Sequence, residues 1–304
     1  MKSSLEYLPE LKQRELARIV EIILEEFADA VGGGTAAFKL KGRILKIILF
    51  GSYARGTWVD EPHTMKGYRS DYDILVVVNN RKLADPEYWY KATDRLMHDK
   101  AIKTPVGVVV HAAREMNNYL NDGHYFFSDI RRDGVVLYEL DDRPLAQPRP
   151  LNATDAYRIA KEHFDTRFSY VEGFAAAAKF QLDRKDLKLA AFELHQSIES
   201  AYSVVLLTHT NYSPPSHNLK FLRSLAEDRD IRLVDVWPRD VHRETAWFNI
   251  LNEAYVKARY SRHYEITEEA LIWLIERATH LHELVQMICT EHLEKLKQAA
   301  NMRG

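Results

Sequence analysis

The sequence predicts two domains of different class, an α/β domain with a mixed sheet and helices, followed by an all-α helical bundle. Apolar, β-branched runs of strand length are concentrated before residue 140. Residues 143–150 carry three prolines, which is typical of a linker. Beyond them, apolar residues recur at helical spacing. We therefore expect an α/β domain at 1–142, a linker at 143–150 and a helical domain at 151–304, and 304 residues is a usual length for two domains.

The apolar pattern predicts each element of the first domain in turn. A stripe of apolar side chains predicts a helix over residues 5–30, and the glycines at 32–34 end it. Largely apolar runs with many β-branched residues, at 44–50 and 73–78, are typical of central strands covered on both faces. A helix is expected at 86–100, with further strands at 105–111 and 134–138. The stripe of the first helix consists of Leu8, Leu11, Leu16, Ile19, Val20, Ile23, Leu24 and Phe27.

Helical periodicity dominates the second domain. The expected helices span 154–182, 187–209, 216–229, 240–260 and 267–299, which together favour an all-α bundle. The apolar stripe of the last helix is interpreted as core or as a dimer seam, and we expect Cys289 to pack in it.

Composition limits the classes of function. Hydrophobic residues make up 46% and charged residues 28%, as in an ordinary globular protein. The net charge of −2 gives no overall attraction to nucleic acid or membrane, so a nucleic-acid site has to be a local patch. The single cysteine excludes an internal disulfide, and no apolar run is long enough for a membrane span. We expect a cytoplasmic protein with no membrane partner.

The main chemical motif spans two neighbouring strands. Residues 51–56 (GSYARG) follow the first apolar run, and Asp71 and Asp73 lead into the second. Gly51 permits a sharp turn and the close approach of a phosphate, and Ser52 adds a hydroxyl and an amide where a helix should begin. Two aspartates spaced by two residues on a strand project from one face and suit Mg²⁺. The motif therefore predicts a site for a nucleoside triphosphate and a divalent metal.

These residues resemble the signature of the minimal nucleotidyltransferases, relatives of DNA polymerase beta and of the kanamycin nucleotidyltransferases. The resemblance covers about residues 35–140. It implies that Gly51 and Ser52 hold the triphosphate of ATP or another NTP, and that Asp71 and Asp73 hold Mg²⁺ and act in catalysis. For Arg55 two interpretations remain, a contact with phosphate or an ion pair at the domain surface.

One departure from that family concerns a third carboxylate, which the family usually carries on the next strand. Here residues 106–111 (VGVVVH) contain no acid. His111 is the only polar group on that strand that can take its place, and the alternative is a satisfied surface histidine at a strand end. Asp60 and Glu61, in the long loop at 57–70, are further candidates for the metal, although loop acids are usually solvated.

In the second domain, residues 254–264 (AYVKARYSRHY) interleave cations with aromatic rings, a composition that binds phosphates and stacks bases. If the segment is helical throughout, Arg259 and His263 share one face at i and i+4. Such a pair can hold a phosphate and move a proton without metal. The competing interpretation is a helix end with cations favourably placed at its C-terminus.

The helical half resembles a HEPN domain through three features: His195 with Glu199, the turn at 216–219 (SHNL) and the helix end at 258–260 (ARY). Many HEPN domains are metal-independent ribonucleases that use an Arg and a His across a dimer. In some toxin–antitoxin systems the nucleotidyltransferase silences its HEPN partner by adding AMP to a tyrosine. The resemblance thus implies a homodimer, RNA as a partner, and Tyr260 or Tyr264 as acceptors in the chain itself.

Only three residues separate Arg259 from His263, whereas the ribonucleases have four to six. On the residues alone, His195 and Glu199 are interpreted as a buried structural pair.

Three functions follow from these patterns. The leading prediction is a Mg²⁺-dependent transfer of a nucleotidyl group from an NTP to a hydroxyl of a protein, an RNA end or a small molecule. The alternatives are a metal-independent HEPN ribonuclease regulated by the first domain, and a nucleotide sensor without catalysis.

Overall fold

The structure, a computed structural model, describes residues 1–60 and 70–302. These residues form two compact units, one made of residues 1–60 and 70–150 and the other of residues 151–302.

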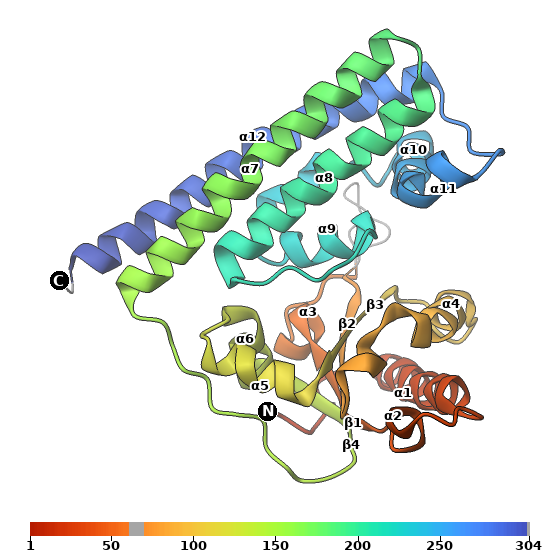
Figure 1. Cartoon of the computed structure of the whole chain (residues 1–304), viewed down its shortest axis with the longest axis vertical. Helices are drawn as coiled ribbons and strands as arrows, with labels where there is room; N and C mark the ends of the chain where they lie inside the picture. The colour runs from red at the N-terminus through yellow and green to blue at the C-terminus, as the bar shows by residue number, and fades with distance from the viewer. Residues whose placement is uncertain (61–69, 303–304) are drawn as a thin grey trace. The chain divides into compact units, whose positions relative to one another are not determined.

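The first unit is built on a mixed four-stranded sheet in the order β3-β2-β1-β4 (Figure 1). β1 (Ile44–Phe50) runs antiparallel to both of its neighbours, β2 (Tyr72–Val78) and β4 (Val135–Glu139). β3 (Val106–Ala112) runs parallel to β2, and the chain makes the necessary crossover through α4 (Tyr90–His98). The expected mixed sheet and its four strands are confirmed.

Helices cover both faces of this sheet. α1 (Glu10–Val31) shares one buried cluster with alternate residues of β2, which include Tyr72 and Ile74. The opposite face carries α5 (Ala113–Asn121) and α6 (Tyr125–Asp133), where Phe126 meets Phe50 edge to face at 5.4 Å between ring centroids. Because side chains alternate along a strand, Asp73 projects to the face opposite Tyr72. The short helical segments are α2 (Ala37–Leu40), α3 (Gly51–Arg55), Arg81–Ala84 and Pro86–Tyr88.

The first helix differs from its prediction at the N-terminal end and on its buried face. It begins at Glu10 rather than at residue 5, because Pro9 disfavours helical backbone at the residue before it. Leu11, expected in the apolar stripe, is 53% exposed, whereas the charged Lys12 and Glu15 are buried. Two ionisable groups therefore occupy core positions of α1.

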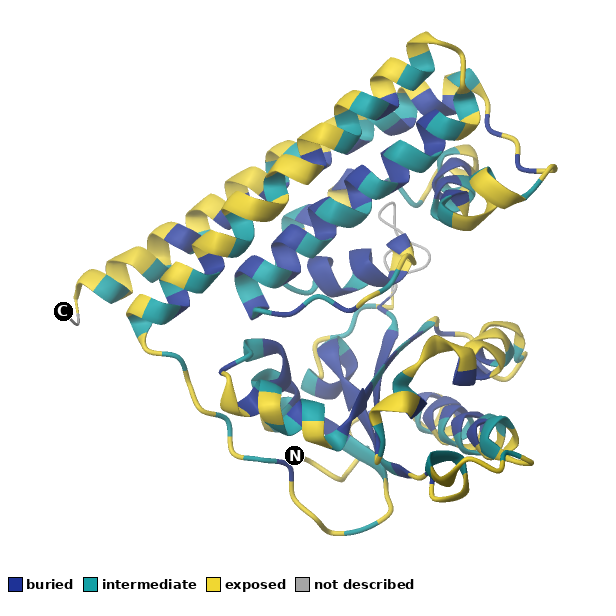
Figure 2. Cartoon of the chain, in the orientation of Figure 1, coloured by how far each residue is buried: buried dark blue, intermediate teal, exposed yellow. Residues whose placement is uncertain are grey.

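The second unit consists of helices, as expected. Its long helices α7 (Ala153–Asp183), α8 (Leu187–Thr210) and α12 (Glu268–Asn301) pack against one another (Figure 1). The hydroxyl of Ser197 on α8 ties all three, since it donates to the carbonyl of Val171 at 2.8 Å and lies 3.2 Å from Nε2 of His282. α8 is buried along most of its length, whereas α7 and α12 each expose a long face (Figure 2).

Shorter helices close the bundle beside α8. α9 (Leu219–Glu227) is shorter than the predicted 216–229, because the side chain of Asn218 caps its first turn. The predicted helix at 240–260 is divided at Glu253 into α10 (His242–Asn252) and α11 (Ala254–Tyr260). A 3₁₀ segment at Ile231–Val236 was not predicted.

Candidate active site

The glycine turn and the second aspartate lie directly against each other. Phe50, the last residue of β1, is the ladder partner of Asp73 on β2. Gly51 follows with a φ of +74°, and a Cβ atom built on it would lie 2.1 Å from Oδ2 of Asp73. Both the backbone conformation and the space therefore require glycine at this position. The expected phosphate turn and the expected metal carboxylate meet at one point.

The rest of α3 separates into buried and accessible residues. Tyr53 and Ala54 are buried in the core, whereas Ser52 and Arg55 remain partly exposed at the surface of the turn. Arg55 and Lys2 help to lower the pKa of the Asp133 carboxyl, after the larger effect of a hydrogen bond from Arg132. Arg55 thus lies near Asp133, at the end of α6.

Asp71 and Asp73 flank a buried tyrosine. Asp73 is 4% exposed, Asp71 is partly buried, and Tyr72 between them is fully buried on the α1 side of the sheet. Alternation along β2 directs the Asp73 carboxylate to the face opposite Tyr72, and Asp71 immediately precedes the strand. Such a pair, beside a turn that leaves room for phosphate, has the oxygen donors that Mg²⁺ prefers.

The neighbouring strand brings no third acid to this pair. Gly107 is the register partner of Asp73, and His111 pairs with Val77, four residues and about 13 Å further along the strand. His111 instead lies 3.7 Å from Glu115 and edge to face against Tyr119 and Phe127, and its burial lowers its pKa. The proposed substitution by His111 is thus wrong, because the register carries it away from Asp73. Within residues 1–60 and 70–302, no cluster of three His, Cys, Asp or Glu side chains suits a metal.

Asp60 lies on the α1 side of the sheet, opposite to the face that carries the Asp73 side chain. Its carboxylate is 3.2 Å from the ammonium of Lys12, which sits among Tyr53, Tyr72 and Thr104 on the α1 side. It is therefore unsuited to share a metal with Asp73. Glu61, the second loop acid, falls outside the described residues.

A second group of polar side chains meets in the helical unit. His217, in the turn before α9, lies 3.0 Å from the carboxylate of Glu199 on α8. Its ring stacks on Tyr255 with centroids 3.4 Å apart, and the guanidinium of Arg259 lies 4.4 Å from the same Tyr255 ring. We call Glu199, His217, Tyr255 and Arg259 the helical-unit cluster. In it, an imidazole paired with a carboxylate and an arginine guanidinium both contact one tyrosine ring.

Contacts with neutral groups orient Arg259. Its Nε donates to the carbonyl of Tyr255 at 2.8 Å, and its guanidinium also lies over the rings of Phe192 and Tyr260. Among the residues that the structure describes, these contacts hold the arginine without neutralising it. Such an arginine is suited to bind an anion.

His263 does not share a helical face with Arg259. α11 ends at Tyr260, and the hydroxyl of Ser261 accepts a hydrogen bond from the backbone N–H of His263 at 3.2 Å. This local bond competes with the helix and ends it before His263. The i, i+4 geometry expected for the pair is therefore wrong. His217 is the histidine that shares the Tyr255 ring with Arg259, and the 216–219 turn that contains it was the available sequence signal.

His195 has the structural role expected of it. It is fully buried, its Nε2 lies 3.0 Å from the carbonyl of His217, and burial lowers its pKa to about 4. Glu199, 3.6 Å away, differs from the expectation of a buried pair, because its side chain is 20% exposed and also reaches the exposed His217.

Comparisons with known proteins agree with both units. Residues 36–115 match the model of a nucleotidyltransferase domain, and residues 170–288 match the model of a HEPN domain. A relative from Methanocaldococcus jannaschii, named "Putative protein adenylyltransferase", is 33% identical over 120 residues. The match covers 39% of this chain and 97% of the relative. The chain belongs to the nucleotidyltransferase family and carries a HEPN domain. Both resemblances are confirmed, and a nucleotidyltransferase domain implies an NTP substrate.

Exposure separates the two tyrosines of the HEPN domain that were expected as acceptors. Tyr260, at the end of α11, is 75% exposed. Tyr264 is 4% exposed, and its hydroxyl is directed to the carbonyl of Ile250 at 3.3 Å. Only Tyr260 presents its side chain for modification in this conformation.

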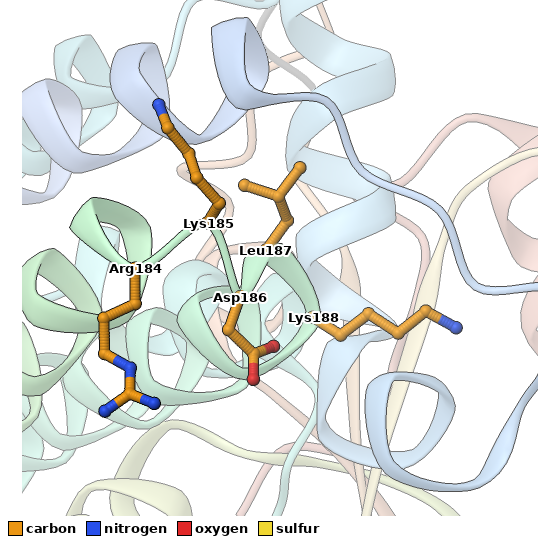
Figure 3. A pocket seen from close by; sticks show the side chains of 5 residues that line it. All are labelled: Arg184, Lys185, Asp186, Leu187 and Lys188. Carbon is orange, nitrogen blue, oxygen red and sulfur yellow. The ribbon is translucent and has the colours of Figure 1, made fainter.

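A basic hollow at the turn between α7 and α8 of the HEPN domain offers no convergent site. Arg184, Lys185 and Lys188 line it but point in different directions (Figure 3). Lys185 pairs with Glu268, and Lys188 donates to the carbonyls of Ser261 and Arg262. Asp186 caps α8. The polar groups there serve to join helices.

The helices of the described chain include none with the length and apolar character that a membrane crossing requires.

Proposed function

We propose that the first domain transfers the nucleotidyl group of ATP to a hydroxyl group, with Asp71 and Asp73 holding Mg²⁺. The observation that carries this proposal is the contact between Gly51 and Asp73, which joins a phosphate-sized turn to a buried carboxylate. Bound Mg²⁺ would neutralise charge on the triphosphate. Gly51 and Ser52 are proposed to hold the phosphates, and Arg55 to contribute at the rim of the turn.

In the proposed reaction, the acceptor oxygen bonds to the α-phosphorus while the bond to the bridging oxygen breaks. Pyrophosphate leaves, and the acceptor proton passes to solvent. The described part of β3 supplies no carboxylate to take that proton, so the acceptor has to ionise without one. We therefore expect the transfer rate to rise with pH until the acceptor is ionised.

The acceptor is proposed to be a protein hydroxyl, in agreement with the printed name of the relative. Tyr260 is the exposed candidate within the chain, and a phosphate on it would lie near the Arg259 guanidinium, which is 5.0 Å from the ring. Modification there would block the helical-unit cluster, which supports the proposed regulatory, toxin–antitoxin type of role.

Incubation with α-labelled ATP and Mg²⁺ tests the proposal. We expect label on protein, and its loss in Asp71→Ala and Asp73→Ala. Loss in Tyr260→Phe but not in Tyr264→Phe would identify the acceptor. Label on RNA or a small molecule would replace the protein acceptor. If ATP binds but no labelled product forms, the remaining interpretation is the non-catalytic nucleotide sensor.

A second candidate function is metal-independent RNA cleavage by the HEPN domain. The specific observation that favours it is the meeting of His217, paired with Glu199, and Arg259 on one tyrosine ring. In the proposed step, His217 accepts the proton of a ribose 2′-hydroxyl as that oxygen bonds to phosphorus. The 5′-oxygen of the next nucleotide leaves with a proton from solvent, and Arg259 stabilises the charge on phosphorus.

RNA cleavage in EDTA tests this second candidate. We expect loss of at least tenfold in Arg259→Ala and in His217→Ala, because each removes one of the two roles. His263→Ala is the comparison suggested by the sequence. We expect it to reduce cleavage less, because His263 lies beyond the end of α11 and shares no helical face with Arg259. If His263→Ala abolishes cleavage while His217→Ala does not, the site is the Arg259–His263 pair, completed in the proposed homodimer.

A further inference from the structure

A buried polar network lies behind the two aspartates, on the α1 side of the sheet. The hydroxyl of Tyr72 donates to Oε2 of Glu15 at 2.9 Å. Glu15 is 1% exposed and also accepts from the hydroxyl of Thr104 at 3.0 Å and from the backbone N–H of Lys103 at 2.9 Å. Thr104 in turn accepts from the ammonium of Lys12 at 2.7 Å.

This network joins the segments that border the nucleotide turn. Lys12 reaches Asp60 at 3.2 Å, beyond the end of α3, and the ring of Tyr53 in α3 lies 4.4 Å from the ring of Tyr72. The backbone N–H of Tyr72 donates to the carbonyl of Pro105 at 2.8 Å. Tyr72 is thus fixed at its backbone, its ring and its hydroxyl.

Stability alone does not account for these residues. A buried carboxylate and a buried ammonium each carry a desolvation cost, and apolar side chains of similar volume often serve a core equally well or better. Departures from core patterning are expected where a site needs support. Here the supported residue is the one between Asp71 and Asp73.

We propose that Glu15 and Tyr72 are positioning residues for the metal carboxylates. By holding the Tyr72 side chain on the α1 side, Glu15 sets the pleat of β2 and thereby the direction of Asp71 and Asp73 on the other face. Small displacements of a catalytic group have large effects on rate. The inference rests on the proposed nucleotidyl transfer and adds two residues that do not touch the substrate.

The test compares Tyr72→Phe with Tyr202→Phe. Both remove one hydroxyl from a fully buried tyrosine, and Tyr202 accepts a hydrogen bond from Trp237 at 2.7 Å in the HEPN domain, the unit that does not contain the nucleotide turn. For Tyr72→Phe we expect kcat to fall at least tenfold and the half-saturating Mg²⁺ concentration to rise several-fold, measured well below the unfolding temperature. Tyr202→Phe should change neither. Glu15→Gln, which keeps an acceptor for Tyr72, should retain more activity than Glu15→Leu.

The outcomes separate this inference from the proposed function. If the wild-type protein transfers nucleotide and Tyr72→Phe matches Tyr202→Phe, the positioning role is wrong and the transfer stands. If Mg²⁺ and ATP raise the Tm of the wild-type protein but no nucleotide is transferred, the proposed transfer fails. The positioning role is then tested by the rise in Tm, which Tyr72→Phe should reduce. If neither transfer nor a rise in Tm occurs in the wild-type protein, both proposals are overturned.

Discussion

Single residues at the nucleotide turn satisfy two demands at once. Gly51 adopts a φ of +74° and also lacks the Cβ atom that would collide with Asp73. Gly33 has a similar φ of +72°, but no atom lies within 4 Å of the place where its Cβ would be. Substitutions at the two glycines therefore distinguish the cost of a left-handed backbone from the cost of a steric clash with a neighbouring side chain.

Gly51→Ala and Gly33→Ala form a matched pair of variants. Gly33→Ala should lower the free energy of unfolding by about 1–2 kcal/mol through the left-handed backbone alone, with transfer activity unchanged. Gly51→Ala should lower stability further and reduce transfer by at least a hundredfold, because Asp73 has to move. Urea unfolding and transfer assays measure the two effects. Equal losses of stability and of transfer activity in the two variants would show that the contact with Asp73 has no role.

At the scale of elements, patterns confined to one segment predicted well. Largely apolar runs located β1 and β2, and the order of the motif placed Gly51 and Asp73 at adjacent ends of these strands. Contacts between segments that are far apart in the sequence could not be predicted from such local patterns. His217 and Arg259 contact the same Tyr255 ring only because the turn before α9 folds back on α11. The burial of Glu15 likewise depends on the later Tyr72 and Thr104, although its place on the apolar face of α1 was a usable signal.

The paired helices α8 and α12 contain four histidines whose burial lowers their pKa. His195 and His282 fall to about 4, His209 to about 3, and His292 is also lowered. His209 and His292 stack with ring centroids 4.1 Å apart, so a charge on one opposes a charge on the other.

This arrangement predicts that acid destabilises the HEPN domain. Each folded-state pKa lies below the unfolded value of about 6.5, so the unfolded chain binds more protons as the pH falls below that value. The stability that these neutral histidines contribute should be fully present near pH 7 and decline as the pH falls from about 6.5 toward the folded-state pKa values of about 4 and about 3. Thermal unfolding followed across this range measures the slope, and His282→Gln should flatten it. A Tm independent of pH from 7 to 5 would contradict the assignment of neutral buried histidines.

At the scale of the whole molecule, the proposed division at residues 143–150 predicts that the helical half folds alone. A fragment of residues 151–304 should show helical circular dichroism and a cooperative thermal transition, since its three long helices pack on one another. Sedimentation of the same fragment would show whether it forms the proposed homodimer. A fragment without a cooperative transition would mean that the helical half depends on the first domain.

Nucleotidyl transfer by the first domain is the central claim, and Asp73→Asn tests it most directly. Asparagine keeps the size of the side chain against Gly51 but removes the charge that would hold Mg²⁺. The decisive measurement is incorporation of label from α-labelled ATP over a Mg²⁺ titration, with wild-type protein and this variant side by side. We predict Mg²⁺-dependent incorporation by the wild-type protein and a loss of at least a hundredfold in Asp73→Asn. Equal incorporation by both proteins, or ATP binding with no incorporation by either, would contradict the claim.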